Sequence, residues 1–371
     1  MTWVILAFFS HLVFIPSIYD GFSLPKRLYV FGLGVAAIYW LLREKKPLPF
    51  FPLIALYLGI SLIPLLWLTN PALFVERLAL DVACFALFWA VALSKVDEPK
   101  LIFVFLFSIW VIVLVLISSH FTFPSSGGVM GNIKYIAIVS AQVATFPLVM
   151  STMGFFAASA LMFLSLGSRT AFAAAFMALC FFVVLKKRIA PRLFKTFLSV
   201  IALAPAFVLI LATTVSISDR DEVWRNSPKM LSGFHKLAFG IGKGQFETLY
   251  PAYVDRTKNV YHTGSVLKTK AGSIPIAPWG HPQSWTHPHN EFLALLIEGG
   301  LIGLTLFWSL IVLVLVKGDP GNPISAAIFC SLIVMLLVST FWFSFTHPSM
   351  AATFWATAGL LCAYSRDFRR L

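Results

Sequence analysis

The feature that most constrains this chain is the repeated occurrence of apolar runs long enough to cross a lipid bilayer. The hydrocarbon core of a bilayer is about 30 Å thick, so a crossing helix needs about 20 mostly apolar residues. Only 12% of the residues are charged and 59% are hydrophobic, whereas soluble domains carry about 25% charged residues. The chain is therefore predicted to be a membrane protein that crosses the bilayer many times.

Turn residues between the apolar runs divide the chain into about twelve predicted spans. These are residues 3–18, 28–42, 49–68, 78–94, 101–119, 135–150, 155–166, 170–185, 196–213, 291–316, 323–345 and 350–364. No internal repeat or low-complexity tract divides the sequence further. We expect an all-α polytopic fold that forms one membrane domain over residues 1–371.

The placement of Lys and Arg predicts how these spans are oriented, because cytoplasmic loops of membrane proteins are enriched in both residues. With a cytoplasmic N-terminus, the cytoplasmic loops hold 14 of them, whereas the short loops on the other side hold 5, including Arg77 and Arg169. Both termini are therefore predicted to be cytoplasmic. This bias also accounts for most of the net charge of +13 without a nucleic-acid partner.

One long polar segment, residues 214–290, lies on the external side under this topology. Long loops translocate regardless of their charge, so its basic residues do not contradict the orientation. A structureless loop of this length is uncommon unless it is functional. Its amphipathic stretch 222–239 is predicted to form one or two helices over the membrane surface.

The most specific local pattern stands where this loop meets the next span, at His289-Asn290-Glu291-Phe292. It places an imidazole and an amide at the outer mouth of a helix, whose N-terminus offers free N–H groups and partial positive charge. Gly299, Gly300 and Gly303, one to two turns deeper, would let another helix approach closely. The structural alternative is a helix cap with packing glycines and an interfacial histidine.

The glycine-rich run Gly240-x-Gly242-x-Gly244, which contains Lys243, is interpreted as a turn that shapes the loop. It lacks the Lys-Ser/Thr ending and the strand context of a phosphate-binding loop. Asp81 lies inside a span, where a carboxylate is typical of proton or ion paths. No partner for it is evident in the sequence.

A metal site is the other chemistry that the loop invites, because His281 and His287 lie close to His289. Histidine pairs bind zinc, but no cysteine or carboxylate stands at a motif-like spacing. The external loop also lacks an Asp-x-Asp pair for a metal-bound sugar nucleotide. We therefore predict neither a metal nor another cofactor.

Several short motifs occur in one order and together resemble the O-antigen ligase and polymerase superfamily. The last of them follows that family's pattern of His, Asn/Ser/Gln, nine residues, Gly, two residues and Gly/Thr/Tyr. The matching residues are Ser168-Arg169-Thr170, Arg220 to Trp224 as Arg-x-x-x-Trp, Phe239 to Phe246 with its glycines, and His289, Asn290, Gly300 and Gly303. They cover about residues 168–303, so the resemblance rests on the ordered set.

The resemblance implies a GT-C type membrane glycosyltransferase whose donor is a sugar chain on undecaprenyl diphosphate. On this basis Arg169, Arg220 and Arg225 are expected to bind the diphosphate, because arginine stays charged and grips phosphate through two donors. His289 is expected to be the base that deprotonates the acceptor hydroxyl. Asn290 is expected to position the acceptor or the loop. Direct attack predicts inversion at the donor carbon.

Three activities within the superfamily remain open. A ligase would transfer O-antigen to the lipid A–core oligosaccharide on the periplasmic face of the bacterial inner membrane. A polymerase would extend the lipid-linked chain, and an O-oligosaccharyltransferase would glycosylate protein. The single large loop and the short C-terminal region favour the ligase. From another class, a transporter of the same lipid carrier would also need many spans and a basic groove.

Overall fold

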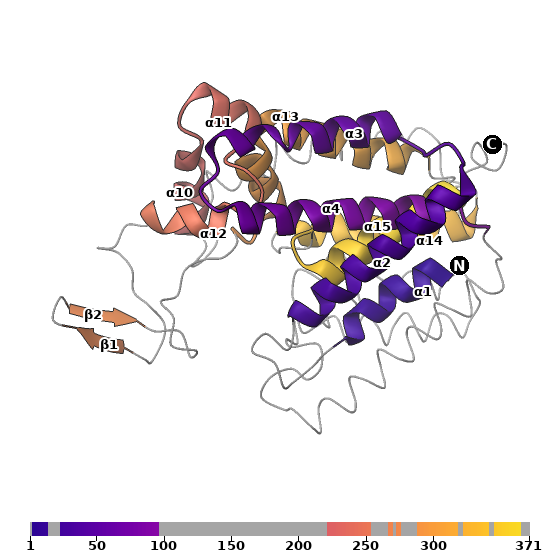
Figure 1. The fold of residues 1–371 in the computed structure, drawn as a ribbon, viewed down its shortest axis with the longest axis horizontal. Coiled ribbons are helices and arrows are strands. Elements are labelled where there is room, and N and C mark those ends of the chain that lie inside the picture. The colour runs from indigo at the N-terminus through magenta and orange to yellow at the C-terminus, as the bar shows by residue number, and fades with distance from the viewer. Residues whose placement is uncertain are drawn as a thin grey trace, which may run out of the picture.

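The computed structural model describes residues 2–13, 23–95, 221–253, 266–269, 272–275, 288–317, 322–340 and 345–364. The described chain is mainly helical (Figure 1). Its helices are α1 (Thr2–Phe9), η1 (Ser10–Leu12), α2 (Ser23–Glu44), α3 (Phe51–Ile60), η2 (Ile63–Trp67), α4 (Pro71–Ala92), α10 (Asp221–Asn226), η5 (Ser227–Leu231), α11 (Phe234–Phe239), α12 (Phe246–Leu249), η6 (Tyr250–Ala252), α13 (Glu291–Val316), α14 (Pro323–Ser339) and α15 (Pro348–Tyr364). Two strands, β1 (Val266–Thr269) and β2 (Gly272–Pro275), form an antiparallel hairpin.

The core of the bundle lies where α4 packs against α15 and α2. Aromatic rings fill this contact, with Phe85 and Trp355 only 4.7 Å apart between centroids. A Cβ on Gly359 would lie 2.4 Å from the carbonyl oxygen of Phe88, so the two backbones touch directly. Small residues allow such close packing, and in lipid this packing supplies much of the helix association energy.

Asparagine residues mark the starts of three described helices. Asn70 accepts from the amide of Leu73, and Asn322 accepts from the amide of Ile324. Both are followed by proline, which has no N–H to leave unpaired in the first helical turn. Asn290 caps α13 in the same way. These helix starts follow from asparagine N-capping, which depends only on residues close together in the sequence.

The first turns of α4, α13 and α15 lie together at one end of the bundle. Arg77 of α4 donates from Nη1 to the carbonyl oxygen of Thr346 at 2.6 Å, and Glu291 of α13 accepts from the Thr346 amide at 3.0 Å. The end of α1 also reaches this region, because Ser349 Oγ donates to the Ser10 carbonyl at 2.9 Å. Helix α1 therefore runs toward this end, and α4, α13 and α15 run away from it.

These relative directions are those that the predicted alternation of spans requires. Figure 1 shows α10, α11 and α12 at the same end as the first turn of α13, with the N-terminus toward the opposite end. The segment 221–253 thus forms a helical cap over one end of the bundle. The stretch predicted as one or two surface helices contains α10, η5 and α11.

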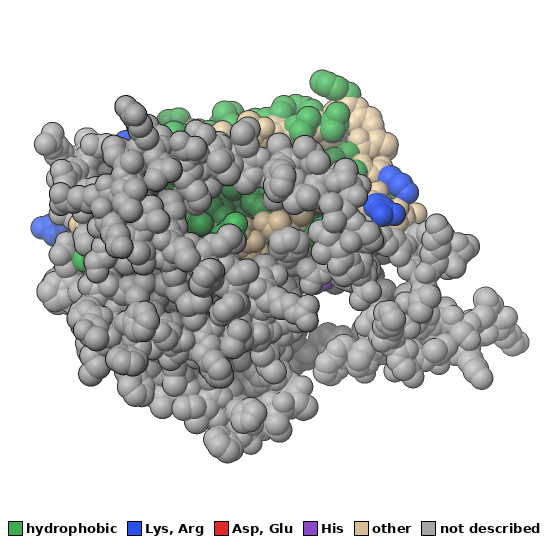
Figure 2. Space-filling model, turned by 180° about the vertical axis from the view of Figure 1, so that it is seen from behind, with side chains coloured by type: hydrophobic (Ala, Val, Ile, Leu, Met, Phe, Trp, Pro, Cys, Tyr) green, Lys and Arg blue, Asp and Glu red, His purple; other side chains and the backbone are tan. Residues whose placement is uncertain are grey.

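The described helices vary in how clearly they indicate a membrane. Helix α13 is the one described helix that is both long and apolar enough to cross a bilayer, whereas α14 and the α3–η2 segment are shorter apolar helices. Large apolar side chains are nevertheless exposed on other helices, including Val35 (67%), Leu42 (71%) and Leu56 (51%). Figure 2 shows apolar side chains along one edge of the molecule. Such exposure is unusual for a soluble monomer and suits contact with lipid.

The helical class predicted from the sequence is confirmed, apart from the hairpin in the external loop. Seven predicted spans fall in the described part of the chain, and five, between residues 101 and 213, lie outside it. The third span is interrupted at Ser61 and continues as η2, because Pro64 cannot supply a helical N–H. The eleventh ends as a helix at Ser339, earlier than expected.

Candidate functional site at the start of α13

The site begins with the residue that precedes the cap of α13. His289 is half-buried and has a φ of 52°, in the left-handed region that few non-glycine residues adopt. Asn290 returns the chain to extended geometry, and its Oδ1 accepts from the amide of Leu293 at 3.0 Å. The sharp turn therefore separates the imidazole from the helix that follows it. The strained backbone at this position is typical of functional sites.

The chain just before His289 is held by segment 221–253. Trp224 of α10 is 2% exposed, and its indole Nε1 donates to the Pro288 carbonyl oxygen at 2.7 Å. Trp224 packs in a second apolar core with Phe246 and Ile297. This core joins α10 and α12 to the inner face of α13. Residues far apart in the sequence thus fix both sides of the His289 turn.

A break in α13 receives the glycine-rich segment of the loop, residues 240–246. Gly300 has φ 66° and ψ −174°, which interrupts the helix. Because the helix is broken there, the carbonyls of Ile297 and Glu298 accept from the amides of Ile241 (2.9 Å) and Gly242 (3.1 Å). A Cβ on Gly300 would lie 2.3 Å from the Ala238 carbonyl oxygen, so the approach requires glycine.

The same segment carries a lysine into the helix bundle. Lys243 Nζ forms an ion pair with Asp81 of α4 and donates to Tyr57 Oη of α3 at 2.7 Å. Burial alone would lower the pKa of Lys243, but the Asp81 carboxylate and the Tyr57 hydroxyl raise it above its ordinary value overall. The ammonium therefore stays charged at neutral pH. Asp81, which had no evident partner in the sequence, is paired with a loop residue.

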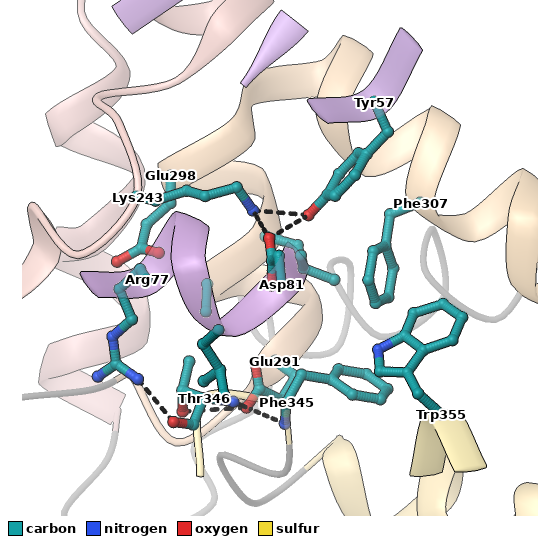
Figure 3. Close-up of a pocket in the computed structure, with 13 residues that line it drawn as sticks. Tyr57, Arg77, Asp81, Lys243, Glu291, Glu298, Phe307, Phe345, Thr346 and Trp355 are labelled. Carbon is teal, nitrogen blue, oxygen red and sulfur yellow. Dashed lines mark hydrogen bonds and ion pairs between the residues drawn. The ribbon is translucent and has the colours of Figure 1, made fainter. Parts of the chain in front are cut away.

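A small pocket lies between these groups and the first turns of α13 and α15. Figure 3 shows its polar lining, in which Arg77 and Glu291 both point to Thr346. The Glu291 carboxylate is 1% exposed and accepts from the Phe345 amide at 2.7 Å and from Thr346. Glu298 of α13 also lines the pocket, beside Lys243 (Figure 3).

Comparison with known proteins finds one similar family. The family model described as O-antigen ligase matches residues 154–308. No curated protein matches the chain. The predicted resemblance to the superfamily is thereby confirmed.

The O-antigen ligase match gives the chain a coarse function. It indicates a bacterial membrane protein of the ligase or polymerase type, a glycosyltransferase of lipopolysaccharide biosynthesis that acts on lipid-linked polysaccharide. The matched stretch contains α10 to α12 and the start of α13 with the Gly300 break. Asp81, Arg77 and Trp355 lie outside it, so the pocket joins the family segment to the rest of the chain.

The structure brings some of the predicted site residues together. His289, Asn290 and Gly300 all lie on α13 or its cap, and Arg225 directly follows Trp224, which holds Pro288. The Arg225 side chain is exposed. Arg169 and Arg220 lie outside the described residues, as do His281 and His287. The described part of the chain has no group of three metal-ligating side chains.

Two predicted roles can be described more closely. Asn290 is 1% exposed and caps α13 through Oδ1, while its Nδ2 has no hydrogen-bond partner among the described residues. This arrangement favours positioning of the His289 turn. At Gly303, an added Cβ would meet nothing within 4 Å, in contrast to Gly300. The sequence predicts that another helix approaches at these glycines, and this is wrong for the described residues: the backbone of segment 238–240 makes the close approach, and it does so at Gly300.

Sequence reasoning missed three polar residues of the pocket. Lys243 was read as part of a turn, Arg77 was counted in a short loop, and Glu291 was noted only as a neighbour of His289. A lysine between glycines in a loop gives no sign that it enters a bundle. The available signal was Asp81, because a carboxylate inside a span needs a counter-charge.

Proposed function

We propose that this protein is an inverting, metal-independent O-antigen ligase. It transfers O-antigen polysaccharide from undecaprenyl diphosphate to the lipid A–core oligosaccharide on the periplasmic face of the inner membrane, within a GT-C type fold of about twelve spans. The observation that carries the proposal is the His289 turn. A half-buried imidazole stands on a strained backbone at the mouth of a helix, fixed by a cap, an indole and a backbone contact.

His289 acts as the general base in this proposal. An imidazole is largely neutral at pH 7 and accepts a proton from the sugar hydroxyl as that oxygen attacks the donor carbon. The oxygen forms the new glycosidic bond while the bond to the diphosphate breaks, and one displacement inverts the anomeric configuration. Asn290 supports this step by holding the His289 turn against α13.

Arginines stabilise the leaving diphosphate in this proposal. Negative charge grows on that group as the bond breaks, and guanidinium groups placed beforehand stabilise it without a metal. This role is supported for Arg225 by its position next to Trp224, the residue whose indole binds the Pro288 carbonyl just before His289. Arg169 and Arg220 complete the set by their match to the family motifs.

The test is transfer by the purified protein in detergent, with lipid-linked O-antigen as donor and lipid A–core present or absent. A ligase makes product only when lipid A–core is present. Lengthened lipid-linked chains without lipid A–core would show a polymerase, and no product in either case would favour a transporter. His289→Ala is expected to abolish transfer. His235→Ala, which removes an exposed loop histidine, serves as the matched control.

A further inference from the structure

The glycine-rich segment 240–246 contacts two parts of the bundle at once. On one side its backbone amides bind the carbonyls of Ile297 and Glu298 at the break in α13. On the other side Gln245 Oε1 accepts from the amide of Asn70 at 2.8 Å, and its Nε2 donates to the Asn70 carbonyl at 2.7 Å. The segment therefore bridges the helix that begins beside His289 and the junction before α4.

Lys243 is the only charged side chain in this bridge, and it points into the bundle. Its ammonium contacts Asp81 of α4 and the Tyr57 hydroxyl, and lies 4.6 Å from the centre of the Tyr57 ring. The lysine is 8% exposed. Charge pairs of this kind are strong where water is excluded, and removal of one partner leaves the other buried without a counter-charge.

The glycines leave the bridge little room to move. A Cβ on Gly244 would lie 2.8 Å from the Leu73 carbonyl oxygen, and one on Gly240 would lie 2.3 Å from the Glu298 carbonyl oxygen. The segment is thus in backbone contact with both α4 and α13. Lys243 is the residue of the segment whose side chain enters the bundle. Its ion pair with Asp81 therefore fixes how far the segment lies between α4 and α13.

We propose that Lys243 and Asp81 form a positioning pair, which fixes segment 240–246 between α4 and α13 and so sets the place of His289 for the transfer reaction. This inference rests on the proposed function. The pair does not touch substrate. It acts through the Ile241 and Gly242 contacts at the α13 break, and a misplacement of about 1 Å can cost an enzyme about 100-fold in rate.

An ion path, the role first considered for Asp81, fits these contacts less well. A path for protons or ions needs a carboxylate that is free to exchange its partner. Here the Asp81 carboxylate is paired with a lysine and lies within 3.5 Å of the Tyr57 hydroxyl. Phe307, Phe345 and Trp355 line the pocket beside it with aromatic rings, which offer an ion no ligand.

The experiment compares Lys243→Met, Asp81→Asn and the double variant K243M/D81N in the transfer assay. The neutral double variant removes both charges, so it folds without a buried unpaired ion. We expect it to insert normally but to lose roughly tenfold or more in kcat, with a smaller change in KM. The reason is that His289 would be misplaced while the groups that bind the substrates are unchanged. Lys243→Arg keeps the charge and is expected to retain more activity than Lys243→Met.

The control is Lys229→Met, which removes an exposed loop lysine that bonds only to Asn226 in its own loop. It should transfer like the unchanged protein. Full activity of K243M/D81N would overturn the positioning role, and failure of that variant to insert would also overturn it, because the pair would then serve folding. If the unchanged protein and Lys229→Met show no transfer, the proposed function itself fails.

Discussion

At the scale of single residues, the site depends on a small number of side chains that form hydrogen bonds with the backbone. Asn290 caps α13, Trp224 holds the Pro288 carbonyl, and Glu291 holds the turn before α15. Each bond fixes the chain close to His289 and leaves the imidazole itself half-buried. The histidine is therefore placed by its neighbours, which makes its position sensitive to substitutions that never touch a substrate.

Asn290→Ala tests the cap. Loss of an asparagine N-cap costs about 1 kcal/mol of helix stability, and here it also releases the His289 turn. We expect a lower unfolding temperature and a larger loss of transfer than the stability change explains. Asn322→Ala removes the cap of α14 as a matched control. Equal activity of the two variants would contradict a special role for the α13 cap.

The raised pKa of Lys243 predicts how stability depends on pH. Its pKa is raised in the folded protein by Asp81 and Tyr57 against the effect of burial. The stability that Lys243 contributes is then fully present below the ordinary lysine pKa of about 10.4 and is lost only as pH rises through the higher folded value. The gap in unfolding temperature between the unchanged protein and K243M/D81N should stay constant from pH 6 to pH 9, roughly four to one unit below the ordinary value. A gap that closes by pH 8 would contradict it.

At the scale of elements, the break in α13 is the feature that couples the loop to the bundle. Gly300 opens the helix, and the carbonyls thereby released accept the amides of Ile241 and Gly242. An intact helix would use those carbonyls internally and leave the loop without backbone partners. The break in α13 is therefore the place where the loop binds the helix, and it requires glycine at position 300.

Gly300→Ala is expected to be strongly destabilising. Gly300, with φ 66° and ψ −174°, lies in a backbone region that is essentially restricted to glycine and costs other residues about 1–3 kcal/mol. The new Cβ would also lie 2.3 Å from the Ala238 carbonyl oxygen. Gly303→Ala is the control, because its Cβ meets nothing within 4 Å. Its unfolding temperature should stay near that of the unchanged protein. Similar losses in both variants, measured by thermal unfolding in detergent, would argue against the kink as the cause.

At the scale of the whole molecule, the described helices share one consistent polarity. Helices α4, α13 and α15 start at the end that carries segment 221–253, and α1 ends there. This polarity agrees with a cytoplasmic N-terminus and an external loop, as the distribution of basic residues predicts.

Cysteine labelling tests this sidedness. In intact cells with a permeable outer membrane, a membrane-impermeant maleimide should label Lys229→Cys in the loop and leave Lys46→Cys unlabelled until the inner membrane is opened. Cys84, Cys330 and Cys362 are buried and should give little background. The fourth cysteine, Cys180, lies outside the described residues and is replaced by serine in every variant. The reverse labelling pattern would place His289 on the cytoplasmic side and would contradict the proposed function.

The sequence alone determined the helical class and the ordered motif set, because long apolar runs and short motifs are local signals. It also located His289 at the start of a helix that begins at the predicted residue. Only the tertiary structure decided that Gly300 receives the loop and that Lys243 pairs with Asp81, since residues 162 positions apart meet only after packing. Long-range pairing depends on which backbones touch, and no local pattern encodes that.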